Sequence, residues 1–470
     1  MSRVRRALAC ALIALGALGA SAAPALAHAT LLSTTPVING RGVSEDAKQV
    51  VLRFSESVQI LNRPDVTVVN GQGVRVDTGA PHTAPGNTRQ IVIPLKGPLL
   101  PQSYTVRYRI VSADSHSAVQ AFVFGVGNAR LQSPILAGSG GLSDESPVAV
   151  AARVAEFAAL MALLGLLAFR FLVWGPAVQA AKGLDVEGRE TALRRGQRLF
   201  WRAFWAMAIL AGVAETLVLA AKSAVVFHKG IFAAFLAPAD AYRLVSASRF
   251  GDFLGWRCGA LCVLVAVAFV TWTAERAEAP SAGRRGPMAA MGLLGIAALT
   301  LLAGQGHASQ APLAPMEIAF DAVHLTAVSI WLGGLACLAV VLLGAPRALP
   351  EGGRTLASAA LSRFSRLALW AVIVIVVTGV TRAVGELSSP TQLLTTGYGR
   401  SIMLKASLLA PILMIARRNR RMVEALARGR TVPTTARLRA IGRAVQAELA
   451  VAMGIVVVAA ILVAQIPGRA

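Results

Sequence analysis

Two patterns of apolar and polar residues divide the chain. In the first, short apolar runs are separated by turn residues such as Asn70-Gly71 and Pro85-Gly86, and the clearest runs are 50–54, 65–69, 90–93, 104–110 and 121–124. Runs of this length between turn signals are typical of β-strands. Five clear strands, with room for one or two weaker ones in about 100 residues, predict an all-β domain of the immunoglobulin-like sandwich type over residues 28–127.

In the second pattern, which fills residues 147–470, the apolar runs are long enough to cross a lipid bilayer. A spanning helix needs about 20 consecutive, mostly apolar residues. Eight such runs lie at about 147–173, 200–222, 253–273, 287–304, 318–343, 364–385, 400–416 and 448–466. The sequence therefore predicts an all-α polytopic domain of about eight transmembrane helices, joined to the β-domain by a Gly- and Ser-containing linker at 128–146.

The first 27 residues follow a third pattern. A basic start is followed by an apolar stretch and by the small-residue ending Ala25-Leu26-Ala27, which is typical of a cleavable secretory signal peptide over residues 1–27. The alternative is an uncleaved first helix, although the apolar stretch is short for a span. Cleavage after Ala27 would make His28 the N-terminal residue.

The composition agrees with a membrane protein. Of 470 residues, 55% are hydrophobic and only 15% are charged, which is too apolar for an ordinary soluble enzyme. The net charge of +23 does not indicate a nucleic-acid partner, because the basic residues cluster between apolar runs instead of forming a patch with interleaved aromatics. The connections rich in Arg follow the first, third, fifth and seventh runs. We therefore expect them in the cytoplasm, with the β-domain in the periplasm of a bacterial inner membrane.

Cysteine placement excludes a disulfide framework in the β-domain. Of the four cysteines, Cys10 lies in the leader and the others lie in apolar runs, so the β-domain must fold by its own core. Cys258 and Cys262 are four residues apart, which on one helix face gives two soft sulfur ligands for Cu(I). Packing among small residues is the favoured interpretation of this pair.

Candidate metal ligands lie at the start and near the end of the predicted β-domain. An N-terminal His28 offers its amine and its imidazole to one ion, and such nitrogen pairs suit Cu(II). Asp114 and His116 follow a predicted strand at i, i+2, a spacing that puts both side chains on one face if the strand continues. Together these groups make a tetragonal Cu(II) site of three nitrogens and one oxygen. On spacing alone, a solvated Asp-x-His loop is the alternative, and His82, in a loop rich in Pro, Gly and Thr, is expected to be solvated.

The β-domain resembles the CopC periplasmic copper-binding domain. The motifs that carry the resemblance are His28-Ala29-Thr30-Leu31, Leu52-Arg53-Phe54-Ser55-Glu56, Tyr104-Thr105-Val106-Arg107-Tyr108-Arg109, Val111-Ser112-Ala113-Asp114-Ser115-His116 and Phe122-Val123-Phe124. The resemblance implies His28, Asp114 and His116 as Cu(II) ligands. Ser115 stands in place of a usual Gly, and Tyr108 in place of a common Trp. Family members with a Cu(I) site use a Met-rich segment, and because residues 28–127 contain no methionine, Cu(II) alone is expected.

Two histidines of the membrane domain lie on the predicted outer side. His307 follows the fourth run and His324 lies about one to two turns into the fifth, so both lie at similar depth. Polar residues within a span are functional candidates because they are costly there, and hydrogen bonding between helices is the alternative. Asp321, one turn before His324, is expected to orient its ring or to share the site. Further charges that are expected to pair in or near the membrane are Glu156, Glu215, Arg257, Glu386 and Glu448.

The second half of the membrane domain is similar to the CopD copper-resistance membrane family. The matching motifs are Gly306-His307-Ala308, Asp321-Ala322-Val323-His324, Trp331-Leu332-Gly333-Gly334-Leu335, Arg363-Phe364-Ser365-Arg366, Thr378-Gly379-Val380, Tyr398-Gly399-Arg400, Lys405 and Arg418-Asn419-Arg420. The first half of the domain resembles the family mainly in its pattern of spans. The resemblance implies that His307 and His324 contact copper.

These observations predict a copper-binding membrane protein and not an enzyme. The chain has no Gly-x-x-x-x-Gly-Lys-Ser/Thr loop, so it carries no nucleotide-hydrolysis site of that class. The leading hypothesis is copper import, in which the periplasmic domain captures Cu(II), with a periplasmic protein as donor or acceptor, and passes it to His307 and His324. The alternative is copper delivery to a membrane cuproenzyme without net transport. A copper redox enzyme or a haem protein is a third interpretation.

Overall fold

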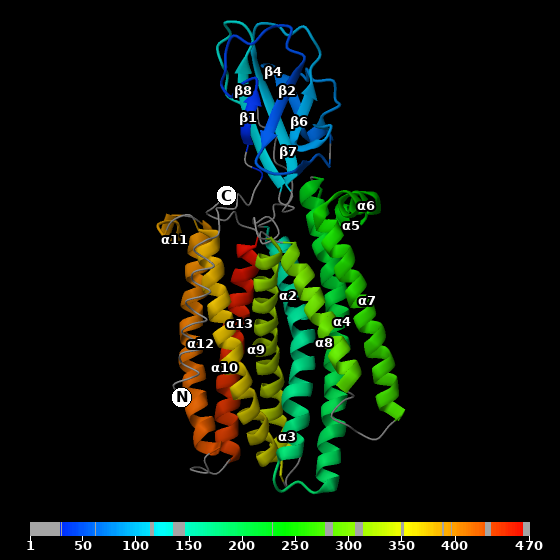
Figure 1. The fold of residues 1–470 in the computed structure, drawn as a ribbon, viewed down its shortest axis with the longest axis vertical. Helices are drawn as coiled ribbons and strands as arrows, with labels where there is room; N and C mark the ends of the chain where they lie inside the picture. The colour runs from blue at the N-terminus through cyan, green and yellow to red at the C-terminus, as the bar shows by residue number, and fades with distance from the viewer. Residues whose placement is uncertain are drawn as a thin grey trace.

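The structure, a computed structural model, describes residues 29–463 except 30, 62, 113–116, 135–145, 228, 278–284, 306–313, 349–351, 388–389, 396 and 428–433. The predicted signal peptide over residues 1–27 and most of the predicted linker lie outside the described residues. A β-domain stands on one end of a bundle of long helices, as Figure 1 shows. This arrangement confirms the predicted fold class.

The β-domain consists of two antiparallel sheets. One has the order β1 (Leu31–Thr35), β2 (Gln49–Phe54), β6 (Asn87–Pro94) and β5 (His82–Ala84). In the other, β7 (Ser103–Ser112) pairs with β3 (Val58–Gln59), β4 (Thr67–Asn70) and β8 (Ser117–Gly125). Strands β1, β3 and β5 were not among the five clear runs, because they are short and carry few apolar residues. His82 lies in β5 and not in a loop, since it pairs with Val92 of β6, and it is exposed as expected.

The core of the β-domain lies between the two sheets and uses no cysteine. Val50, Leu52 and Phe54 of β2 are buried while their neighbours are more exposed, which is the period-two pattern of a strand with one face in a core. Tyr108 is almost fully buried, packs edge-on against Phe54 at 5.6 Å between ring centroids, and donates a 2.8 Å hydrogen bond to Oε1 of Gln120. Tyrosine at this position therefore fills an aromatic core site and satisfies its hydroxyl.

Within the described residues, eight helices are long and apolar enough to cross a membrane, as predicted. They are α2 (Pro147–Ala168), which continues through the π-helical segment η2 (Phe169–Trp174) into α3 (Gly175–Ala180), and then α4 (Val186–Val226), α7 (Arg249–Ala277), α8 (Arg285–Gly304), α9 (Ala314–Ala348), α10 (Gly353–Glu386), α12 (Gly397–Ala427) and α13 (Thr435–Leu462). The short helices α5 (Ile231–Phe235), α6 (Pro238–Ala247) and α11 (Gln392–Thr395) lie at the end of the bundle that carries the β-domain (Figure 1).

Two helices are longer than predicted. Residues 186–199 form the first turns of α4, although their arginines were expected in a connection. Arginine is a good helix former, and the Asp185 carboxylate caps the helix by accepting a 2.7 Å hydrogen bond from the Gly188 N–H. The arginines at 417–421 likewise continue α12. Both basic segments lie at the end of the bundle far from the β-domain (Figure 1).

Glycines bring α2 and α9 into close contact. A Cβ added at Gly165 would lie 2.4 Å from the carbonyl oxygen of Ser329 and 2.6 Å from Cα of Gly333, and one added at Gly333 would lie 2.7 Å from Cα of Gly165. Small residues allow such backbone approach between membrane helices. This contact fixes α9, which carries His324, against α2, which carries Glu156.

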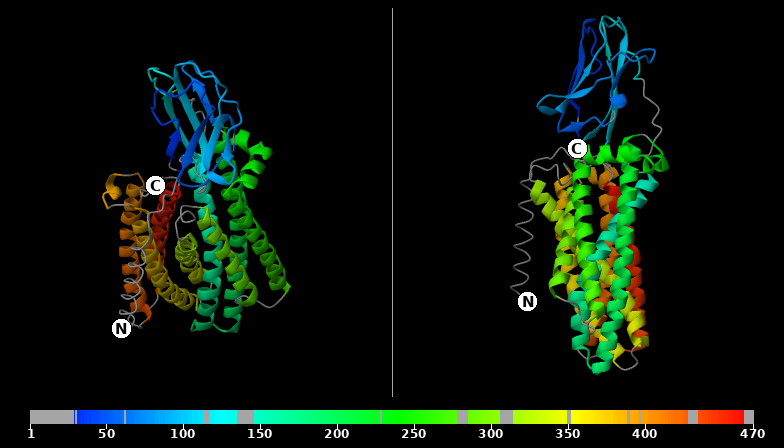
Figure 2. Two further views of the ribbon diagram at one scale, coloured as in Figure 1. Left: turned by 45° about the horizontal axis from the view of Figure 1, so that its top comes forward. Right: turned by 90° about the vertical axis from the view of Figure 1, so that its right-hand side faces the viewer.

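The β-domain packs directly on the helices. Val111, near the end of β7, is buried in a cluster with Ala152 of α2, Val218 and Val226 of α4, Leu244 of α6, and Phe250 and Leu254 of α7. Nη1 of Arg109 donates a 2.9 Å hydrogen bond to the carbonyl oxygen of Val225. Figure 2 shows from two further directions that this end of the sandwich meets the helix ends. We call these residues the docking cluster.

Candidate metal centre

The three predicted Cu(II) ligands of the β-domain, His28, Asp114 and His116, lie outside the described residues. Their described neighbours share one end of the sandwich. Ser117 pairs with Val111, so Asp114 and His116 belong to the connection between β7 and β8. Leu31 pairs with Phe54, and Val58 pairs with Ser112, which places the start of β1 at the same end as this connection. That end faces the helices (Figure 1).

In the membrane domain, His324 is held by a neighbouring helix. Its Nδ1 lies 2.8 Å from Oγ1 of Thr378 on α10, and that hydroxyl donates a 2.7 Å hydrogen bond to the carbonyl oxygen of Val374. A hydroxyl has one hydrogen, so when it is donated to Val374, Nδ1 of His324 is the donor to Thr378. Nε2 of a neutral ring then keeps its lone pair, and this is how a second partner prepares a histidine to bind a metal.

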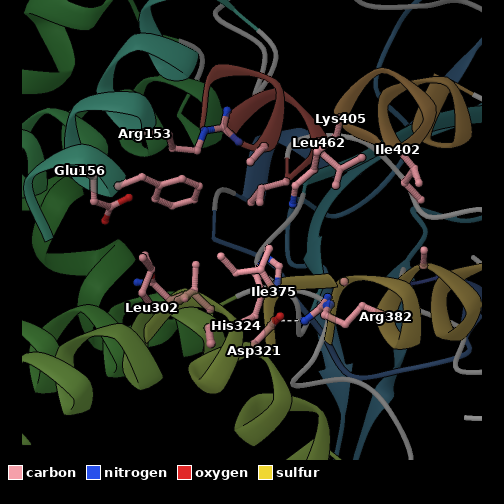
Figure 3. A pocket seen from close by; sticks show the side chains of 18 of the residues that line it. Arg153, Glu156, Leu302, Asp321, His324, Ile375, Arg382, Ile402, Lys405 and Leu462 are labelled. Carbon is pink, nitrogen blue, oxygen red and sulfur yellow. Dashed lines mark ion pairs between the residues drawn. The ribbon is translucent and has the colours of Figure 1, made fainter. Parts of the chain in front are cut away.

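His324 borders a cavity of about 380 Å³ at the end of the bundle that carries the β-domain. Residues from α2, α4, α7, α8, α9, α10, α12 and α13 line it. Figure 3 shows that Glu156, His324, Asp321, Arg382 and Lys405 surround this space. Phe250 and Val218 line the cavity and also belong to the docking cluster. The end of β7 therefore contacts the residues at the rim of the cavity.

Asp321, expected to orient the ring of His324 or to share its site, has an ion-pair partner of its own, and its part in the site remains a prediction. Its carboxylate pairs with the guanidinium of Arg382 on α10, although it lines the same cavity. Arg382 lies one turn beyond Thr378, and α9 and α10 pack side by side. Asp321 and His324, one turn apart on α9, therefore each meet a different partner on α10.

His307 lies outside the described residues, so its pairing with His324 remains a prediction. The described residue Gln305, at the end of α8, lines the cavity and accepts a 2.5 Å hydrogen bond from Arg257. Among the described residues, no group of three or more His, Cys, Asp and Glu side chains is placed to hold a metal ion. Cys258 is half-buried beside the docking cluster, and Cys262 is exposed on the helix surface.

The structure also assigns partners to four charged residues that the sequence left unpaired. Arg257 contacts both Glu156 and Glu215, and Glu448 accepts a 2.6 Å hydrogen bond from Asn419. The role of Thr378 was missed, although its motif was recognised, because the hydrogen bond to His324 joins residues 54 positions apart.

Comparisons with known proteins agree with this architecture. In chain order, the sequence matches the family models of the CopC domain over residues 31–127, of the copper resistance protein D-like N-terminal domain over residues 143–312, and of copper resistance protein D over residues 358–462. The fold and these matches define a multi-pass membrane protein of copper handling. More particularly, the chain belongs to the copper resistance family in which a CopC domain precedes a CopD-type membrane domain, as the resemblance implied.

The chain is 28% identical over 397 residues to the copper transport protein CutJ of Bacillus subtilis (strain 168), and this match covers 83% of the chain and 67% of that protein. Among solved structures it is similar to CopC from Methylosinus trichosporium OB3b, with 20% identity, 23% of this chain and 100% of that chain covered, and a TM-score of 0.19. It is also similar to PcoC, a methionine-rich copper resistance protein from Escherichia coli, with 25% identity, 21% and 98% coverage, and a TM-score of 0.17. CopC-like domains bind copper, which supports copper as the metal of this chain.

Proposed function

We propose that this protein imports copper, with the β-domain capturing Cu(II) in the periplasm and passing it directly into the membrane cavity at His324. The ligands of the first site are His28, Asp114 and His116. The observation that carries the proposal is the docking cluster. The strand that leads to Asp114 and His116 packs through Val111 on Phe250 and Val218, which line the cavity.

The chemistry of the cavity supports His324 as a copper-binding residue. His324 presents an imidazole nitrogen with a free lone pair, because Nδ1 is occupied by Thr378. Imidazole binds both common oxidation states of copper better than it binds Mg²⁺ or Ca²⁺, which favour oxygen ligands. A metal released by the β-domain therefore meets a group that binds copper inside the bundle. His307, predicted at the same depth, would supply a second imidazole.

Radioactive copper uptake into cells tests this proposal. Cells expressing the wild type are compared with cells expressing His116→Ala, His324→Ala and the control His82→Ala, with equal protein amounts in the membrane. Loss of a ligand or of its support commonly costs a metal site about 10- to 100-fold in affinity, so uptake should fall by at least about tenfold in the first two variants. His82 is an exposed residue of β5, and its variant should match the wild type.

Equal uptake by all four proteins would contradict import through this route. A protein that serves only as a delivery platform would leave cytosolic copper unchanged when its gene is deleted, whereas an importer lowers it. The same cells, assayed for total cytosolic copper, therefore separate the two functions.

A further inference from the structure

A network of charged side chains lies inside the half of the bundle nearer the β-domain. Arg257 of α7 is 0% exposed. It donates to Oε1 of Glu215 from Nε at 2.7 Å and to Oε2 of the same residue from Nη2 at 2.6 Å. Nη2 also donates to Oε1 of Glu156 on α2 at 2.5 Å, and Nη1 donates to Gln305. One guanidinium thus contacts two carboxyl groups from two other helices.

The two carboxyl groups are held differently. Glu215 binds the guanidinium with both of its oxygens, the geometry that best matches an ionised carboxylate. Glu156 binds it through Oε1 only, and its side chain also lines the cavity that His324 borders (Figure 3). Of the two carboxyl groups, Glu156 is therefore the one that lines the transport cavity.

The charges of this network do not balance if both acids are ionised. An uncompensated charge in a low-dielectric interior is costly, and a buried carboxyl group avoids that cost by taking up a proton. Because Glu215 and Arg257 neutralise each other through the two-oxygen contact, the remaining proton belongs on Glu156. The buried network is then neutral.

Other charged groups lie near Glu156 on its own helix and on neighbouring helices. Arg153 lies one turn earlier on α2, and Lys222 of α4 lines the same cavity. The remaining polar lining groups are Gln305 after α8, Asp321 and His324 of α9, Arg382 of α10 and Lys405 of α12, while the described lining residues of α13 are apolar. Basic groups near Glu156 lower the free energy of its ionised form, and a further positive charge in the cavity lowers it more, which favours loss of the proton.

We propose that Glu156 is a proton-binding site of the transport cavity, which holds one proton while the cavity is empty and releases it when a copper cation binds at His324. This inference rests on the proposed function. In the step, the O–H bond of the Glu156 carboxylic acid breaks and the proton leaves to solvent water. The electron pair stays on the carboxylate, whose charge then offsets part of the charge of the metal, and no group is oxidised or reduced.

Proton counting tests the inference. Purified full-length protein in weakly buffered detergent solution is titrated with Cu(II), and released protons are measured with a pH indicator for the wild type, Glu156→Gln and the control Glu448→Gln. Glu448 is equally buried but lines no part of this cavity. We expect Glu156→Gln to release about one proton fewer per protein than the wild type. The control should release the wild-type number, and an unchanged number in Glu156→Gln would overturn the inference.

Two further measurements keep the test decisive. If Glu156→Gln cannot be purified, infrared difference spectra of the wild type with and without Cu(II) report the same event, because a protonated carboxyl band must disappear when copper binds. Persistence of all such bands would overturn the inference. His324→Ala separates the two proposals. If His324→Ala binds as much copper as the wild type, the membrane site is contradicted. If His324→Ala binds fewer copper ions but Glu156→Gln releases the wild-type number of protons, only the proton site is contradicted.

Discussion

Two buried arginines join the same three helices, but their charges are balanced differently. At the end of the bundle far from the β-domain, Nη2 of Arg170 in η2 lies 2.8 Å from each carboxylate oxygen of Glu275 on α7. Trp201 and Gln197 of α4 also donate to that carboxylate, and the guanidinium lies 4.5 Å from the ring centroid of Phe200. Among the described residues, no second carboxylate contacts Arg170.

Arg257 links α7 to the same helices α2 and α4 nearer the β-domain, but it contacts two carboxyl groups, one of which lines the cavity. A one-to-one pair enclosed by aromatic rings holds helices together and has no group that must titrate. A two-to-one network at a cavity contains a group whose protonation follows the charge beside it. On the function proposed above, the far end of the bundle is structural and the end nearer the β-domain carries the transport chemistry.

The largest expected effect comes from removing each arginine. Arg257→Gln and Arg170→Gln each leave buried acids without their cation, which commonly costs about 3–5 kcal/mol of stability. Thermal unfolding of the purified proteins measures the loss. If Glu156 is already neutral, adding Glu215→Gln should restore most of the stability lost in Arg257→Gln, whereas adding Glu156→Gln should restore little. Equal restoration of stability by Glu215→Gln and Glu156→Gln would show that the two acids are equivalent, and would contradict a neutral Glu156 beside an ionised Glu215.

A buried carboxylate outside the membrane sharpens the comparison. Asp77 accepts hydrogen bonds from the Thr67 hydroxyl at 2.7 Å, the Val68 N–H at 2.9 Å and the Gly79 N–H at 2.8 Å, and from Nε of Arg75. Burial alone raises the pKa of a carboxyl group, but these donors hold the pKa of Asp77 below its ordinary value. This acid is thus kept ionised by its donors, whereas Glu156 shares its guanidinium donor, Nη2 of Arg257, with Glu215.

The lowered pKa of Asp77 gives a pH dependence of known sign. A group whose folded-state pKa is depressed contributes stability above its unfolded-state pKa of about 4, and that contribution is lost as pH falls through the folded-state pKa. Asp77→Asn should cost about 1–3 kcal/mol near neutral pH, because an NH2 group replaces one carboxylate oxygen and one of the two backbone N–H groups, that of Val68 or that of Gly79, loses its acceptor. Hydrogen exchange of the β4 amides in the full-length protein measures this. If the exchange protection of the β4 amides in Asp77→Asn still decreased in acid as steeply as in the wild type, groups other than Asp77 would cause the pH dependence.

A smaller effect is expected from the partner of His324. Thr378→Val removes the acceptor that fixes the ring, and the loss of such a second partner lowers metal binding by about tenfold. Copper uptake should fall accordingly in Thr378→Val and recover in Thr378→Ser. Thr381 of the same helix donates only to the Val377 carbonyl oxygen at 3.0 Å, so Thr381→Val is the matched control. Equal uptake by both valine variants would show that the hydrogen bond to His324 has no role in transport.

The smallest effect is expected from the two cysteines of α7. Cys262 is exposed on the helix surface and Cys258 is half-buried beside the docking cluster, so neither belongs to the cavity lining. Replacing both with serine should change copper uptake by less than about twofold, as is usual for substitutions away from functional features. A loss as large as that of His324→Ala would place a metal contact on α7.

The sequence predicted the architecture well because each element has its own local signal. Eight apolar runs became eight spans, and strands with alternating apolar residues became β2, β6 and β7. The predicted bounds of α4 and α12 were too short, because the arginine-rich turns at 186–199 and 417–421 remain helical beyond the apolar stretch. The short strands β1, β3 and β5 depend on pairing with longer neighbours, which a local pattern does not reveal.

The site was less predictable because its contacts join distant positions. His324 was recognised as a polar residue in a span, but a local i, i+3 spacing favoured Asp321 as its partner over Thr378, which is 54 positions away. Arg257, Glu156 and Glu215 were recognised as intramembrane charges. Arg257 lies 42 positions from Glu215 and 101 from Glu156, and residues so far apart in sequence cannot be paired from a local pattern. Only packing of α2, α4 and α7 determines which acid lines the cavity.

The most direct test of the account is copper uptake into proteoliposomes that contain only this protein and an internal copper chelator. His324→Ala is compared with the wild type, while the Cu(II) electron paramagnetic resonance signal of the β-domain is recorded for both. The account predicts that the signal is unchanged and that uptake by His324→Ala falls to the level of protein-free vesicles. Filling of the vesicles at the wild-type rate by His324→Ala would contradict passage of copper through this cavity.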